Sequence, residues 1–149
     1  MADNSRMREV KSTAVVAQSA ARIYALINDI ESYPAFLPWC KSARVESRSD
    51  AEVVATLGMK LGPLQLEFTT RNQLDPEHRI TIALERGPFK QLDGIWLLTP
   101  IGDSGCRVDL QLQFEFSIGV LGAVLTPLFT QISASLVGAF VARARQVYG

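Results

Sequence analysis

The feature that most constrains this chain is a long stretch without a charged residue between Glu115 and Arg143. As a single helix it is long enough to span a bilayer. However, Pro127, Gln131 and several serines and threonines interrupt it, and a pattern typical of a complete water-soluble domain precedes it. We therefore expect a helix over about Gly119–Tyr148 that covers a sheet with a broad apolar stripe, kinked or split at Pro127.

Alternating apolar and polar residues predict an antiparallel sheet before this helix. The first strand covers Arg8–Val16, and an amphipathic helix follows after the N-cap residue Ser19. Residues 32–40 hold two prolines, which leave room for a single helical turn. From Leu64 onward, the even-numbered residues, most of them apolar, are expected to face inward on every strand, and short turns separate the runs. The pattern predicts an α+β fold with a curved antiparallel sheet of about seven strands around the long helix, and two short helices after strand one.

Composition limits the classes of partner. The 15 basic and 15 acidic residues cancel, so no overall field attracts DNA or an anionic membrane, and membrane contact is peripheral at most. Cys40 and Cys106 match no metal-ligand or redox spacing, which favours free thiols in a cytoplasmic protein. The polar N-terminus lacks the apolar run of a secretory signal. We expect residues 1–6 to be a disordered tail and residues 7–149 to form one domain.

Two motifs carry a resemblance to a known family. They are Tyr33-Pro-Ala-Phe-Leu-Pro-Trp-Cys40, and Gly87-Pro-Phe-Lys-Gln-Leu92 followed by Gly94-Ile-Trp96. With them the chain resembles the coenzyme Q-binding START-like family of the polyketide cyclase/dehydrase superfamily, in the bacterial group that includes the ribosome-association toxin RatA. The resemblance covers residues 7–149 and implies the helix-grip fold. It leaves function open, since the family is linked both to ubiquinone and to the large ribosomal subunit.

Catalytic groups are sparse. His78 is the only histidine and lies in a charged turn, and neither cysteine has a histidine partner. Ser104 lies in a Gly-Asp-Ser-Gly turn without the context of a nucleophile elbow, and no metal-ligand cluster is apparent. The sequence therefore favours a protein without enzymatic activity or required cofactor. An aromatic cyclase is a weaker alternative because it needs polar groups inside the cavity.

A cavity between sheet and helix is the better hypothesis, because apolar pockets with few polar groups hold hydrophobic ligands. The aromatic residues expected to line it, or else to pack the core, are Phe36, Trp39, Phe68, Phe89, Trp96, Phe114, Phe129 and Phe140. Thr70 and Asn72 are also even-numbered, so their side chains are expected to face the interior of the domain. They either contact a ligand carbonyl or lie at the rim of the sheet and contact water.

Two functions follow. The first is non-catalytic binding of an isoprenoid such as ubiquinone, in support of respiratory electron transport, with the protein cytoplasmic or peripheral at the inner membrane. The alternative is a translation inhibitor that binds the large ribosomal subunit and blocks subunit association, as the toxin of a toxin–antitoxin pair. Lys41, Arg44 and Arg48 would contact the ribosome, extended by Arg8 and Lys11 if the first two strands pair. A solvated sheet face explains the same residues.

Overall fold

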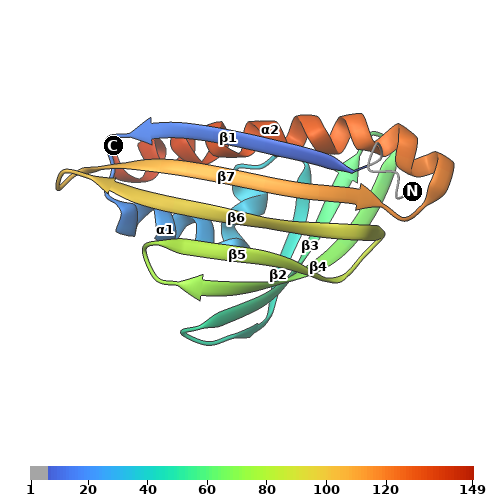
Figure 1. Ribbon diagram of the computed structural model, residues 1–149, viewed down its shortest axis with the longest axis horizontal. Coiled ribbons are helices and arrows are strands. Elements are labelled where there is room, and N and C mark those ends of the chain that lie inside the picture. The colour runs from blue at the N-terminus through green and yellow to red at the C-terminus, as the bar shows by residue number, and fades with distance from the viewer. Residues whose placement is uncertain (1–6) are drawn as a thin grey trace.

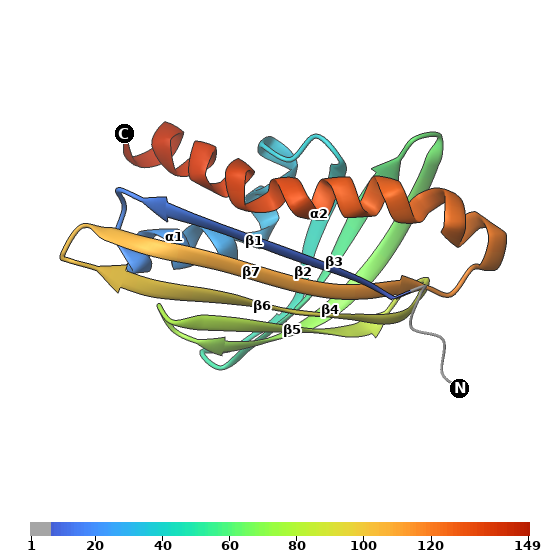
Figure 2. The same ribbon diagram turned by 45° about the horizontal axis from the view of Figure 1, so that its top comes forward.

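The computed structural model describes residues 7–149, so the predicted tail at residues 1–6 lies outside the described part. One seven-stranded antiparallel sheet bends around a long helix (Figures 1 and 2). The elements are, in chain order, β1 (Arg8–Val16), α1 (Ala20–Asn28), the 3₁₀ helix η2 (Ile30–Ala35), β2 (Cys40–Arg48), β3 (Glu52–Leu61), β4 (Leu64–Asp75), β5 (Arg79–Arg86), β6 (Phe89–Ile101), β7 (Gly105–Phe116) and α2 (Gly119–Tyr148).

The strand order is β1-β7-β6-β5-β4-β3-β2, so the first strand pairs with the last one. Strands β2 to β7 form a meander of hairpins, and β1 and β2 are the two edges. The helices α1 and η2 connect these two edges (Figure 1). The predicted α+β helix-grip fold is confirmed, whereas pairing of the first two strands does not occur.

The period-2 pattern places the core on the concave face of the sheet. On β7 the buried residues alternate with half-buried or exposed ones. The buried residues are Cys106, Val108, Leu110, Leu112, Phe114 and Phe116. Helix α1 begins where the Ser19 hydroxyl accepts a hydrogen bond from the Arg22 N–H at 3.2 Å. Its apolar side buries Ile23, Leu26 and Ile27 against the same core.

Helix α2 continues through Pro127, so of the two alternatives expected there, a kink or a split, the split does not occur. Pro127 is exposed, which keeps its ring out of the packed interface. Hydroxyls bond back to carbonyls on either side of it: Thr126 to the Gly122 oxygen and Thr130 to the Thr126 oxygen, each at 2.7 Å. Tertiary packing of the inner face outweighs the local cost of the missing amide donor.

Within residues 7–149, α2 is the one helix long and apolar enough to cross a membrane. Its inner face is packed in the core instead, where Leu125, Phe129, Val137 and Phe140 are buried. The opposite face is uncovered (Figure 2), and 28% of the most apolar 18-residue stretch is buried. The helix is therefore apolar on a side that no other element within residues 7–149 covers.

Candidate functional site

A cavity of about 100 Å³ lies between α2 and the concave face of the sheet. Of the aromatic residues predicted to line it, Trp39, Phe68, Trp96, Phe129 and Phe140 do so. Aliphatic residues from α1, η2, β3, β5, β6, β7 and α2 complete the wall. No Asp, Glu, His, Lys or Arg is part of this lining, so the cavity offers an apolar environment with few hydrogen-bonding groups.

Phe36, Phe89 and Phe114 do not line the cavity. Phe89 and Phe114 pack with Phe129, at ring-centroid distances of 5.3 and 4.7 Å, in a cluster nearer the start of α2. Phe36 packs edge-to-face against Phe140 at 5.2 Å. These aromatic contacts close the two ends of the interior, so the space left between them is small.

Thr70 and Asn72 both line the cavity, on adjacent inward positions of β4. Thr70 is 8% exposed. The Oδ1 atom of Asn72 is buried and has no hydrogen-bond partner in the described part of the chain. Of the two places expected for these residues, the interior is the one observed. A buried amide oxygen without a donor is costly, which makes Asn72 the main polar feature of the cavity.

Two further polar residues of the lining, Tyr33 and Ser133, were not predicted. The Tyr33 hydroxyl donates to the Ile27 carbonyl, and burial raises the pKa of Tyr33 well above its usual value. Ser133 is buried and donates to the Phe129 carbonyl at 2.8 Å. Its position four residues after Phe129, on the inner stripe of α2, is a signal that could have identified it. Both hydroxyl hydrogens are already used within the protein.

The residues considered for catalysis lie apart from the cavity. His78 is exposed in the turn between β4 and β5, with its ring nitrogen 3.9 Å from Asp75. Cys40 and Cys106 are buried as free thiols, and neither lines the cavity. Within residues 7–149 no group of three His, Cys, Asp or Glu side chains could hold a metal ion.

The three basic residues proposed for the ribosome do not share one face of β2. Arg44 pairs in register with Thr56, on the convex face. A register shift between Val45 and Ser47 brings Arg48 opposite Val53, a buried core residue of the concave face. There the Arg48 guanidinium donates to the Asn28 carbonyl at the end of α1, at 3.4 Å. The bulge therefore separates Arg48 from Arg44, while Lys41 lies at a second register shift, between Cys40 and Ser42.

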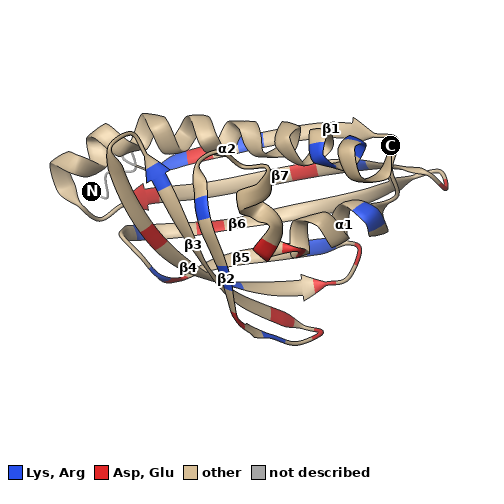
Figure 3. Cartoon of the chain, turned by 180° about the vertical axis from the view of Figure 1, so that it is seen from behind, with Lys and Arg blue, Asp and Glu red and all other residues tan. Residues whose placement is uncertain are grey.

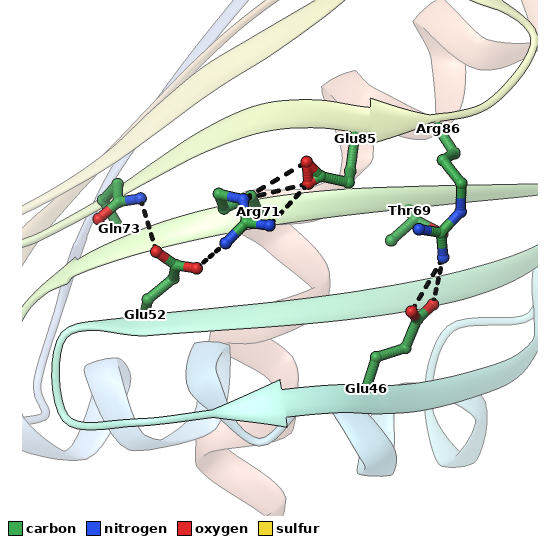
Figure 4. Close-up of polar contacts among 7 residues, drawn as sticks. All are labelled: Glu46, Glu52, Thr69, Arg71, Gln73, Glu85 and Arg86. Carbon is green, nitrogen blue, oxygen red and sulfur yellow. Dashed lines mark hydrogen bonds and ion pairs between the residues drawn. The ribbon is translucent and has the colours of Figure 1, made fainter.

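Carboxylates neutralise other arginines of the convex face (Figure 4). Arg71 forms ion pairs with Glu52 and with Glu85, the latter at 2.9 Å. Arg86 pairs with Glu46 at 2.7 Å. Figure 3 shows that basic and acidic residues are mixed over this side of the molecule. Any cationic contact surface must therefore use the basic residues outside this network.

Comparison with known proteins finds relatives that match nearly the whole of this chain. It is 39% identical over 143 residues to the ribosome association toxin RatA of Vibrio cholerae, covering 96% of this chain and 99% of that one. It is 25% identical to the mitochondrial coenzyme Q-binding protein COQ10 homolog B of Xenopus laevis, covering 97% of this chain and 61% of that one.

Solved structures agree on the fold. The protein TTHA0849 of Thermus thermophilus superimposes with a TM-score of 0.83 at 23% identity, covering 95% of this chain and all of that one. The Zhui aromatase/cyclase of Streptomyces gives a TM-score of 0.81 at 18% identity, covering 94% of each chain. The model of the family described as polyketide cyclase/dehydrase and lipid transport matches residues 16–141. The chain belongs to this polyketide cyclase/dehydrase and lipid transport family.

Proposed function

We propose that this protein associates with the large ribosomal subunit and inhibits translation by blocking subunit association. The observation that carries the proposal is the 39% identity, over nearly the whole of both chains, to a protein named for ribosome association. No large insertion or deletion separates the two, because the match covers 96% of this chain and 99% of the relative. A cytoplasmic location and an antitoxin protein as second partner belong to the same proposal.

The edge formed by β2 and the end of β3 is the part of the surface that best suits a contact with ribosomal RNA. Lys41 and Lys60 are exposed, and within residues 7–149 neither has a carboxylate at ion-pair distance. The Lys60 N–H donates to the Trp39 carbonyl at 2.8 Å, which holds the end of β3 beside the start of β2. Arg44 lies 4.0 Å from Glu46, a loose pair that a phosphate can replace.

Co-sedimentation with purified large subunits tests this function. Wild-type protein should sediment with the subunit, and binding should weaken as salt rises, because phosphate contacts release counterions. The variant Lys41→Glu/Arg44→Glu should bind at least about tenfold more weakly. The matched control is Lys11→Glu/Arg107→Glu, which reverses two exposed charges near the opposite edge. Wild-type protein that stays out of the ribosomal fractions would refute the proposal.

A second candidate function is binding of a hydrophobic molecule in the cavity, and the unpaired Asn72 oxygen favours it. Pockets for drug-sized ligands are about 300–1,000 Å³, so a cavity of about 100 Å³ accepts a single ring and not an isoprenoid tail. Ubiquinone would bind with its ring inside, and its tail would have to leave past α2. Native mass spectrometry of freshly purified protein should detect a bound molecule. Empty protein that also fails to take up a quinone would rule this candidate out.

A further inference from the structure

The oxygen of the Asn72 amide is a hydrogen-bond acceptor without a donor. It is buried, and no donor within residues 7–149 reaches it. In the register of the sheet, Asn72 lies opposite Val53 of β3 and Ile82 of β5, so both of its cross-strand neighbours are aliphatic. A buried amide oxygen without a donor costs free energy, so a molecule that brings a donor to it gains affinity.

Two hydroxyl groups of the cavity lining already use their hydrogens elsewhere. The Tyr33 hydroxyl donates to the Ile27 carbonyl. The Ser133 hydroxyl donates to the Phe129 carbonyl. Each of these two oxygens retains a lone pair that can accept a further hydrogen bond. Together with the Asn72 oxygen, the lining therefore contains three oxygen acceptors that call for a donor on the bound molecule.

The rest of the lining restricts the charge and the shape of that molecule. No charged side chain belongs to the lining, so an ammonium or a carboxylate would be buried without a counter-ion. The space of about 100 Å³ admits a single ring. Tyr33 and Trp96 each pack edge-to-face against Phe140 at 5.4 Å, which makes this wall of the cavity aromatic. A neutral aromatic ring that carries a hydrogen-bond donor meets all of these conditions.

We propose that the cavity binds a neutral monocyclic phenol whose hydroxyl donates to the Asn72 Oδ1 atom. The proposal rests on the second candidate function and names the class of molecule for it. A phenolic hydroxyl also accepts, so its oxygen can receive a hydrogen bond from a donor of the lining, such as the Thr70 hydroxyl or the Trp96 indole. A carbonyl or an ether only accepts, and it would leave the Asn72 oxygen unpaired. The cavity therefore favours a phenol over a quinone of the same size.

Titrations with p-cresol and p-xylene test the role of Asn72, because these molecules differ only by a hydroxyl in place of a methyl group. The measured quantity is the ratio of the two affinities, obtained from NMR chemical shifts of isotopically labelled protein. In Asn72→Leu the affinity for p-cresol relative to p-xylene should fall about tenfold, because the hydroxyl loses its acceptor. The control Gln73→Leu, at the next and exposed residue of β4, should leave the ratio unchanged. A change in cavity volume affects both compounds and cancels in the ratio.

A third compound and a second variant complete the experiment. In 4-methylanisole a methyl group replaces the hydroxyl hydrogen, so its affinity relative to p-xylene should not depend on Asn72. If leucine closes the cavity to every compound, Asn72→Ala removes the same oxygen and should lower the p-cresol ratio likewise.

The outcomes separate this proposal from the function on which it rests. An unchanged p-cresol ratio in the Asn72 variants, with p-xylene still bound, would overturn the phenol assignment and leave the second candidate function intact. An equal fall for 4-methylanisole would also overturn it, because the amide would then act as a donor. If wild-type protein binds none of the three compounds, the assignment and the second candidate function fail together.

Discussion

Replacing Asn72 by leucine should stabilise the protein. In the wild type the Asn72 Oδ1 atom is buried without a hydrogen-bond partner among residues 7–149, which costs about 1–3 kcal/mol relative to its hydration in the unfolded chain. Leucine is similar in size, and the adjoining cavity of about 100 Å³ leaves room for its methyl groups. We expect the free energy of unfolding to rise by about 1–2 kcal/mol, after discounting for incomplete burial.

Urea unfolding at equilibrium, followed by circular dichroism, measures this change, provided that wild type and variant share one m-value. Gln73→Leu is the control, since Gln73 is the next residue of β4, is exposed, and donates to Glu52 at 3.2 Å. It should stay within about 0.5 kcal/mol of wild type. A loss of stability in Asn72→Leu would refute the reasoning, because it would mean that the amide already has a partner. A gain in stability accompanied by loss of ligand uptake would indicate that Asn72 is kept for binding.

Three further experiments, on a glycine, on a buried thiol and on a surface carboxylate, also have expected outcomes. A β-carbon at Gly94 would lie 2.8 Å from the Gln111 carbonyl oxygen, so Gly94→Ala should destabilise the fold by about 1–3 kcal/mol in the same assay. Burial raises the pKa of the Cys40 thiol to about 11, so alkylation by iodoacetamide near neutral pH should be slow until the protein unfolds. Hydrogen bonds from Thr56 and Arg86 lower the pKa of Glu46 below 4.5, so its contribution to stability should be present above that pH and lost below it; Glu46→Gln should flatten this part of the pH profile.

The repeating patterns of the sequence predicted much of the fold because they depend on local geometry. Strand β1 has the predicted bounds, and the even-numbered residues of β7 are buried as expected. The neighbour of β1 was not predictable in this way, because alternation gives a strand its two faces and not its partner. The bulge near Val45 was equally hidden, and it moved Arg48 to the concave face.

The candidate site was predicted in part. The alternation of residues along β4 predicted that Thr70 and Asn72 face the interior. Alternation does not predict how closely the neighbouring aromatic residues pack against them. The size of the cavity depends on ring contacts such as Tyr33 with Phe140, at 5.4 Å, between segments far apart in the sequence. The uncovered face of α2 could not be predicted from the sequence, for a different reason. Since this helix is apolar on both sides, its pattern does not show which side meets the sheet.

The pairing of β1 with β7 bears on how the protein is made. The register joins Arg8 to Phe114 and Val16 to Cys106, so the first strand meets its sheet neighbour β7 only after nearly the whole sheet has been synthesised. Until then β1 is an open edge with unpaired amides, a state prone to association with other chains. We expect the meander from β2 to β7 to assemble first, and the N-terminal strand to join in a late and comparatively slow step.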